Sequence, residues 1–338
     1  MKENSENLDH ALQILKGNLG FEDNMLEWAP LVTRLGIKSV HAAKINDCPF
    51  CGSIKYINLS QYLYYSTLSR LRICSDCGLV YSDVKIDKAL TMSHFETGYK
   101  DEGYFKNQRE DIFRQIVDLL CKELPQSANV LDCGGATGVL AEMLMGRRPD
   151  ISIMVSDISS EACDKVRSRG IKAVQGSLSG LLDKVSEKFD AVLLIDVLYY
   201  EEELKKAFSV LGKLLKTDGI ILYRGPNKYF LIKAAVIIRS IFTSRKQLSI
   251  SRRIPFFNPE HLYILRPGFL LQCFRSMGFS NISLLPSPSI KKYKGVWNFA
   301  ARLVDIVAVF IFRLTASIVS PSYFLIARNN MSDKDELN

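Results

Sequence analysis

Residues 129–144 read N-V-L-D-C-G-G-A-T-G-V-L-A-E-M-L, and this stretch decides the fold. A short apolar run is followed by a glycine-rich segment and then by a second apolar run, which predicts a strand, a tight turn and a helix. Glycines let the backbone turn sharply and approach a ligand closely. The first N–H groups of the following helix point toward that ligand. The stretch therefore predicts a small-molecule cradle in an α/β fold.

The order of the glycines excludes two common kinds of cradle. A phosphate-binding loop requires a lysine after its last glycine, and none follows Gly138. A dinucleotide turn requires G-x-G-x-x-G, whereas residues 132–138 read D-C-G-G-A-T-G. A plain strand-to-helix turn is an alternative for this stretch alone. An acid at the strand tip followed by G-x-A/G-x-G resembles motif I of class I S-adenosylmethionine (SAM)-dependent methyltransferases.

Downstream segments extend this resemblance in the order that the family has. Ile151 to Asp157 is a strand ending in an acid about 20 residues after the turn, where a carboxylate usually holds a ribose. Ile171 to Gly176 is a third strand. Phe189 to Asp196 is nearly all apolar, as expected of a parallel strand covered on both faces. Leu214 to Asn227 contains a helix end, a turn, a fifth strand and a Pro-Asn pair that resemble the family's fifth segment.

The resemblance covers roughly residues 95–330 and implies a Rossmann-like sheet with helices on both faces. It implies that the methionine part of SAM is cradled by one acid and three glycines: Asp132, Gly134, Gly135 and Gly138. It places the ribose at Asp157, and the remaining cofactor residues are Ile158, Ser177, Leu178 and Asp196. Serine at position 177 departs from the acid or polar residue that is common there. An N-cap or turn role is the alternative for both Asp132 and Asp157.

The sequence identifies the general base less directly than it identifies the cofactor residues. Leu198-Tyr199-Tyr200 stands where related sequences often have L-E-H, so Tyr200 takes the place of a family histidine. His261, within N-P-E-H-L, resembles a second family motif near the substrate, and histidine suits proton transfer near neutral pH. Tyr200 and His261 are therefore the candidate catalytic residues, with a capping or core role as the alternative for His261. The missing family histidine also leaves open a SAM-binding protein without acceptor chemistry.

Four cysteines precede this region in two C-x2-C pairs: Cys48, Cys51, Cys74 and Cys77. Each pair places two thiolates on one side of a tight loop, and the 22 residues between the pairs include strand-like segments. Four sulfur ligands without an open position are typical of structural zinc, and a redox dithiol is the alternative. A C-P-x-C-G and C-x-x-C-G-L-V-Y pair ahead of a SAM-binding domain resembles bacterial methyltransferases of sugars, cell-surface glycans and natural products. We expect a zinc ribbon at residues 46–85.

Composition and charge limit the kinds of partner that we expect. With 338 residues, the chain has room for one large domain and a smaller one. No secretory signal is visible at the N-terminus, so we expect a reduced, cytoplasmic setting. Residues 224–328 carry 16 Lys or Arg against only Glu260 and Asp305. This asymmetry indicates an anionic partner, such as a phosphate-bearing or lipid-linked substrate, a membrane surface or nucleic acid, unless it is simply a solvated basic face.

Two stretches of the basic region are unusually apolar, Tyr229 to Ile241 and Val296 to Ser320. The second is long enough to span a bilayer, but Arg302, Asp305 and Arg313 interrupt it on roughly one helical stripe. An amphipathic helix that lies on a membrane or covers the active site therefore fits better than a spanning helix. A core helix or a dimer interface is the alternative.

The expected organisation is a helical lead-in at residues 1–45, the ribbon at 46–85, a connecting loop and helix at 86–128, the methyltransferase domain at 129–330 and a polar tail at 331–338. The leading function is a SAM-dependent methyltransferase of a small-molecule, saccharide or lipid-linked acceptor, with peripheral contact at the inner face of the membrane. An RNA methyltransferase that grips RNA with its ribbon and basic face is an alternative. It is less favoured because long apolar stretches interrupt the basic region.

Overall fold

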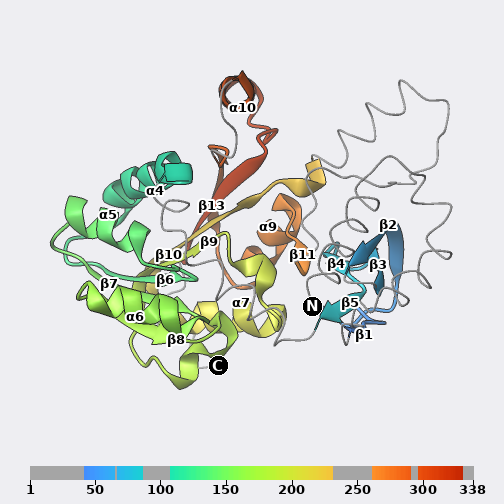
Figure 1. Ribbon diagram of the computed structural model, residues 1–338, viewed down its shortest axis with the longest axis horizontal. Helices are drawn as coiled ribbons and strands as arrows, with labels where there is room; N and C mark the ends of the chain where they lie inside the picture. The colour runs from blue at the N-terminus through green and yellow to red at the C-terminus, as the bar shows by residue number, and fades with distance from the viewer. Residues whose placement is uncertain (1–41, 65–66, 87–106, 231–260, 291–295, 330–338) are drawn as a thin grey trace, which may run out of the picture.

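A seven-stranded sheet forms the centre of the computed structural model, which describes residues 42–64, 67–86, 107–230, 261–290 and 296–329. The strand order is β12-β13-β10-β9-β6-β7-β8 (Figure 1). The strands are β6 (Asn129–Cys133), β7 (Ser152–Asp157), β8 (Lys172–Gln175), β9 (Phe189–Ile195), β10 (Leu215–Pro226), β12 (Asn281–Ser287) and β13 (Ser322–Arg328). Strands β6 to β10 run parallel, and β13 is antiparallel to both β10 and β12. The chain order reverses between β6 and β9, which is where ligands bind in such sheets.

Helices cover both faces of this sheet. They are α4 (Glu110–Glu123), α5 (Val139–Arg147), α6 (Ser160–Ser168), α7 (Leu204–Leu214) and α9 (Pro267–Ser276), with short 3-10 helices η2 (Leu178–Asp183) and η3 (Leu198–Tyr200). A further helix, α10 (Val296–Thr315), belongs to neither covering layer. Ala191 and Leu193 of β9 pack in a core with α4, α5 and α6, whereas Val192 and Leu194 pack in a second core with α7 and α9. This alternation explains why β9 is apolar at nearly every position. The expected class I methyltransferase fold is confirmed.

The cysteine-rich region forms a second, smaller sheet in the order β11-β4-β3-β2. Its strands are β2 (Tyr56–Tyr64), β3 (Thr67–Cys74), β4 (Val80–Ser82) and β11 (Tyr263–Ile264), and β1 (Ala42–Lys44) pairs separately with β5 (Val84–Ile86). Phe50 makes edge-on ring contacts with Phe208 of α7 and Phe269 of α9, at centroid distances of 5.8 and 5.0 Å. Because the ribbon shares its apolar core with α7 and α9, it is packed firmly on the larger sheet.

Several expectations about segments need correction or lie outside the described residues. The lead-in is not helical throughout, because its last residues form strand β1, which pairs with β5. Residues 1–41 of the lead-in, residues 87–106 of the connecting segment, most of the stretch 229–241 and the tail lie outside the described residues. The helix expected before the first strand is α4, and its buried residues include Ile116 and Leu120.

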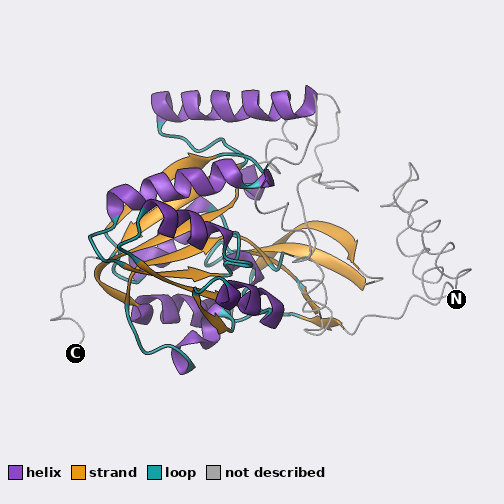
Figure 2. Cartoon of the chain, turned by 60° about the vertical axis from the view of Figure 1, so that its left-hand side comes forward, coloured by secondary structure: helices purple, strands orange, loops and turns teal. Residues whose placement is uncertain are grey.

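The long apolar stretch near the C-terminus forms helix α10, which stands apart from the sheet (Figure 2). Its large apolar side chains are mostly exposed, so the alternative of a core helix is wrong. Within the described part of the chain, no helix is both long and apolar enough to cross a membrane. The helix is therefore held at the surface with its apolar side outward.

Candidate active site and cysteine cluster

The glycine turn joins β6 to α5 at the carboxyl edge of the sheet. Gly134 and Gly138 have φ values of 68° and 79°, in the left-handed region that favours glycine. The Gly134 N–H donates to the carbonyl of Ser156 at 2.6 Å, which ties the turn to β7. A Cβ on Gly134 would collide with the Val197 side chain just after β9. Glycine at position 134 is therefore required by the packing of the turn itself.

Asp132 lies in β6 directly before this turn, with its side chain buried. Burial raises the pKa of Asp132 to about 7, and the negative charge of Asp157 adds to the rise. A Cβ on Gly135 would lie 2.6 Å from the Asp132 carboxylate, so the glycine leaves room for that group. A buried carboxylate with a raised pKa is stabilised by a nearby positive charge. The geometry therefore fits a cationic ligand beside the turn.

Asp157 ends β7 and holds two backbone segments together. Its Oδ2 accepts a hydrogen bond from the Ala136 N–H at 3.0 Å, and its Oδ1 accepts one from the Ser159 N–H at 3.0 Å. The turn role that the sequence left as an alternative is thus present. These two bonds fix the position of the Asp157 carboxylate at the end of β7.

The three predicted adenine-side residues lie near the ends of β7 and β8. Ile158 and Ser177 are partly exposed, whereas the Leu178 side chain is buried and its N–H donates to Glu201 at 3.2 Å. Glu201 also accepts a hydrogen bond from the Ser179 hydroxyl at 2.6 Å, and burial raises its pKa. Glu201, which carried no sequence signal, therefore ties the start of η2 to the end of η3.

Asp196 follows β9 and is held by two arginines that the sequence reasoning missed. Its Oδ2 pairs with Arg109 Nη1 at 3.1 Å and with the guanidinium of Arg224. Arg224 is 1% exposed, and it also donates to the Ser287 hydroxyl at 3.0 Å and to the Pro288 carbonyl at 3.1 Å. Oδ1 of Asp196 is buried without a hydrogen-bond partner among the described residues. Two guanidinium groups therefore meet at one carboxylate oxygen at this edge.

The two candidate catalytic residues, 61 residues apart, meet beside this cluster. The Tyr200 hydroxyl and His261 Nε2 are 3.2 Å apart, and Lys228 Nζ lies 2.7 Å from His261 Nδ1. Tyr199 stacks on the imidazole at a centroid distance of 4.0 Å. His261 and Lys228 are buried, and Tyr200 is partly exposed. Lys228 was missed because a single lysine after β10 carries no pattern, although it directly follows the Pro-Asn pair that marks the strand end.

The ribbon contributes to the position of His261. Leu262, the next residue, donates its N–H to the Tyr199 carbonyl at 3.1 Å, and its own carbonyl accepts from the Ser82 N–H of β4 at 3.2 Å. Strand β11 then pairs with β4. Arg266 extends the junction by donating from Nη2 to the Gly78 carbonyl at 2.6 Å. The segment that carries His261 is therefore fixed between the ribbon and η3.

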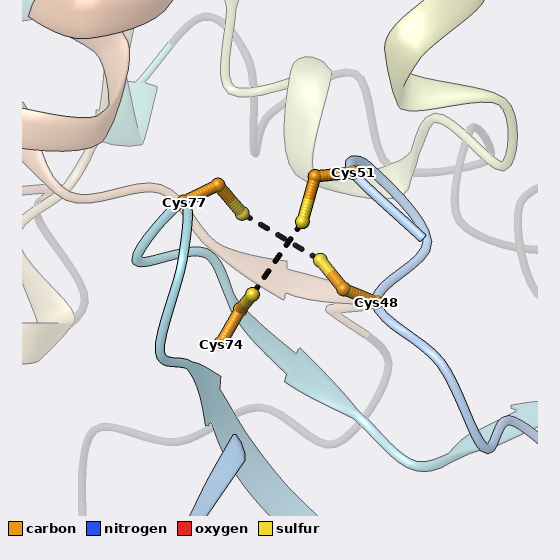
Figure 3. A group of neighbouring side chains, drawn as sticks. All are labelled: Cys48, Cys51, Cys74 and Cys77. Carbon is orange, nitrogen blue, oxygen red and sulfur yellow. Dashed lines mark hydrogen bonds between the residues drawn. The ribbon is translucent and has the colours of Figure 1, made fainter. Parts of the chain in front are cut away.

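The four ribbon cysteines point toward one another (Figure 3). All four are free thiols, and their sulfur atoms lie within 4.8 Å of one another. The sulfur atoms of Cys48 and Cys77 are 3.6 Å apart, and those of Cys51 and Cys74 are 3.5 Å apart. A tetrahedron with metal–sulfur bonds of about 2.3 Å has edges of about 3.8 Å, so these separations fit a single tetrahedral ion. The hydrogen bond between Cys48 and Cys77 lowers the pKa of Cys48 and raises that of Cys77, as expected of two sulfur atoms that share one proton.

Comparisons with curated proteins point to one family. A family model described as a methyltransferase domain matches residues 104–284, more than half of the chain. A malonyl-(acyl-carrier protein) O-methyltransferase of Acetivibrio thermocellus is 23% identical over 172 residues, which cover 50% of this chain and 60% of that protein. The enzyme of the same name from Geobacter sulfurreducens is 25% identical over 145 residues, which cover 41% of this chain and 53% of that protein. The chain thus matches little more than half the length of these relatives.

Among solved structures, a SAM-dependent methyltransferase from Archaeoglobus fulgidus is 17% identical, with a TM-score of 0.43 over 68% of this chain and 100% of that chain. The residues that the family model matches include the glycine turn, Asp157, Asp196, Tyr200 and His261. They also span β6 to β10, whose order and direction are those expected of the fold. The chain belongs to this methyltransferase family.

Proposed function

We propose that this enzyme transfers the methyl group of SAM to an oxygen atom of an anionic small-molecule, saccharide or lipid-linked acceptor. The observation that carries the proposal is the chain of hydrogen bonds from Lys228 through His261 to Tyr200 in η3. A hydroxyl acceptor must lose its proton when it takes the methyl group, so it needs a positioned base. Both curated relatives are named as O-methyltransferases, which favours oxygen over nitrogen or carbon.

The hydrogen-bonded chain has two polarities that differ by the transfer of one proton. With Lys228 neutral, His261 Nδ1–H donates to Nζ, and Nε2 accepts the Tyr200 hydroxyl proton. With Lys228 protonated, Nζ donates to Nδ1, and Nε2–H donates to the Tyr200 oxygen. When the Tyr200 oxygen takes the acceptor's proton, its own hydroxyl proton passes to Nε2 of His261 and the Nδ1 proton passes to Nζ of Lys228. The first arrangement becomes the second with one added proton, and the positive charge lies on Lys228. Tyr200 is thus the proposed base, and His261 and Lys228 are the groups that accept the relayed proton.

The cofactor residues are assigned from the resemblance and supported by their placement. When bound, SAM supplies a methyl group activated by a sulfonium. Asp132 and the three glycines of the turn would hold its methionine part, where the buried carboxylate favours a cation. Asp157 would hold the ribose, and Ile158, Ser177 and Leu178 would lie along the adenine. Asp196 would use its unpaired Oδ1 toward the cofactor or the acceptor.

An anionic acceptor is favoured by the charge at the carboxyl edge. Arg109 and Arg224 meet at one carboxylate oxygen of Asp196, which gathers two guanidinium groups at this edge. Guanidinium groups are well suited to carboxylate and phosphate oxygens. The proposed acceptor site therefore contains Asp196 with its two arginines, and Tyr200. The arginines would orient the anion, and Tyr200 would remove the proton.

We further propose that the four ribbon cysteines hold one structural zinc ion. The sulfur separations and the closed set of four thiols support this assignment. The ion would have no open position for a substrate, so its role would be to stabilise the ribbon. Reduced thiols are needed for this role, which favours a reducing compartment such as the cytoplasm.

A direct test measures S-adenosylhomocysteine formation with separate acceptors: a phosphorylated saccharide, a lipid-linked saccharide phosphate, malonyl-loaded acyl-carrier protein and transfer RNA. We expect turnover with an anionic oxygen acceptor and none with RNA. Tyr200→Phe and His261→Asn should lower kcat roughly 100-fold or more, as expected for loss of a general base. Both variants should keep the affinity for S-adenosylhomocysteine.

Lys228→Met should lower kcat and shift the pH dependence of the rate, because the relay would lose its terminal proton acceptor. Tyr56→Phe, on the exposed edge of the ribbon, is the matched control and should be fully active. Full activity of both Tyr200→Phe and His261→Asn would refute the proposed base. Turnover confined to RNA would instead support the RNA methyltransferase alternative.

A further inference from the structure

Helix α10 presents an apolar stripe to the outside of the molecule. Phe299, Leu303, Ile306, Phe310 and Leu314 recur at intervals of three or four residues, so they lie along one side of the helix. Phe299 is 71% exposed, Ile306 66% and Phe310 61%. An ordinary surface helix turns its apolar side toward the core. The orientation of α10 is the reverse.

The opposite side of α10 carries the polar contacts with the rest of the protein. Asp305 is the only acidic residue between Val296 and Thr315. Its Oδ1 accepts from the Ser289 hydroxyl at 2.8 Å, and its Oδ2 accepts from the Ser289 N–H at 3.0 Å. Ala308, one turn further along the same side, is buried. The acid is therefore turned inward, and the outward side carries no negative charge.

The charges that remain exposed on α10 are positive. Arg302 and Arg313 are exposed and lie 11 residues apart, about three turns, so they flank the same edge of the apolar stripe. An apolar stripe bordered by arginines is typical of helices that lie in the plane of a membrane surface, where the guanidinium groups reach the lipid phosphates.

We propose that α10 docks this enzyme on the surface of an anionic lipid bilayer. The apolar stripe would enter the boundary between head groups and acyl chains, and Arg302 and Arg313 would contact the anionic head groups. At 20 residues, the helix would lie along the surface for about 30 Å. The basic excess of residues 224–328 complements the same negative surface.

A chain of hydrogen bonds joins this surface to the proposed acceptor site. Asp305 of α10 binds Ser289, and the two preceding residues, Ser287 and Pro288, accept hydrogen bonds from Arg224. Arg224 in turn pairs with Asp196. The inward side of α10 is thus fixed to the segment that supports Arg224, so a docked helix would connect the lipid surface to the proposed acceptor site.

Vesicle sedimentation with the full chain tests this inference. Vesicles of phosphatidylglycerol and phosphatidylcholine should bind the protein at low salt, whereas phosphatidylcholine alone should bind it weakly. Because each arginine near an anionic surface contributes roughly fivefold, the variant R302Q/R313Q should weaken binding to the anionic vesicles roughly 30-fold. The variant I306E/F310E should abolish it. The matched control is Ile54→Glu, which changes an equally exposed apolar residue of the ribbon and should bind normally.

Light scattering and thermal unfolding in the absence of lipid distinguish the other possible occupants of the stripe. If I306E/F310E dissociates a dimer and the wild-type protein ignores vesicles, a second copy of the chain covers the stripe and the inference is wrong. If the same variant is less stable but binds vesicles as well as the wild type does, another segment of the chain covers the stripe, and the inference is again wrong. Unchanged stability together with lost vesicle binding is the expected result.

Discussion

Near pH 8, Asp132→Asn should weaken the affinity for the cofactor without lowering the folding stability of the protein that has no cofactor bound. The pKa of Asp132 rises from 3.8 to about 7 because the carboxyl is buried beside Asp157. Between these two pH values the unfolded chain has lost the proton while the folded protein keeps it, so folding becomes less favourable as the pH rises. Since one pKa unit corresponds to about 1.4 kcal/mol, the ionised group costs about 4 kcal/mol of folding stability above about pH 7.

An asparagine at position 132 would not carry this charge. A buried amide without partners costs about 1–3 kcal/mol at any pH, so the variant should be somewhat less stable than the wild type near pH 4. Near pH 8 it should be equally or more stable, because the charged carboxylate is gone. The measured quantity is the free energy of unfolding in denaturant at several pH values, and the difference between the two proteins should shift by about 4 kcal/mol across that range.

Cofactor affinity should change in the opposite direction. If Asp132 holds the cationic end of the cofactor, Asp132→Asn should weaken S-adenosylhomocysteine binding roughly 10- to 100-fold at about pH 8, the usual effect of losing a charged hydrogen bond. Wild-type affinity should rise with pH through about 7, with proton release seen by calorimetry. Asp164→Asn, at an exposed carboxylate, is the control. Unchanged cofactor affinity, or a variant whose relative stability falls as the pH rises, would refute this reasoning.

Two further changes test the other parts of the site. Cys51→Ser should release the proposed zinc ion and destabilise the ribbon, because metal binding and folding are coupled in small modules; metal analysis and circular dichroism of the purified variant would show both effects. Arg224→Met should cost about 3–5 kcal/mol of folding stability, because it breaks a buried ion pair of Asp196. Denaturant unfolding measures this cost, and a loss well below 1 kcal/mol would mean that Arg109 alone compensates the carboxylate.

The sheet could be predicted because its strands carry local signals. Strands β6, β7 and β9 are apolar runs that end in an acid or a glycine turn, and each was located to within a residue or two. Strands β4 and β11 were not anticipated, since three and two residues are too short to show a period. Their pairing depends on contacts between segments about 180 residues apart in the chain.

The candidate site was only partly predictable for the same physical reason. The glycine turn and Asp157 lie within one strand–turn–helix unit and its neighbour, so local spacing marks them. Arg109 reaches Asp196 from a position 87 residues earlier, and no sequence pattern connects them. For helix α10, the sequence predicts the element but not its orientation. Periodicity predicted the helix, but which side faces outward depends on the contact between Asp305 and Ser289.

The ribbon has a larger role than a separately folded accessory module would have. Its strand β4 pairs with β11, and the residue between β11 and His261 bonds to both β4 and η3. The imidazole is therefore oriented from one side by Tyr199 and from the other by a backbone that the ribbon holds in place. The glycine turn, Asp132 and Asp157 make their contacts within the larger sheet and do not depend on this junction. Damage to the cysteine cluster should consequently impair proton removal before it impairs cofactor binding.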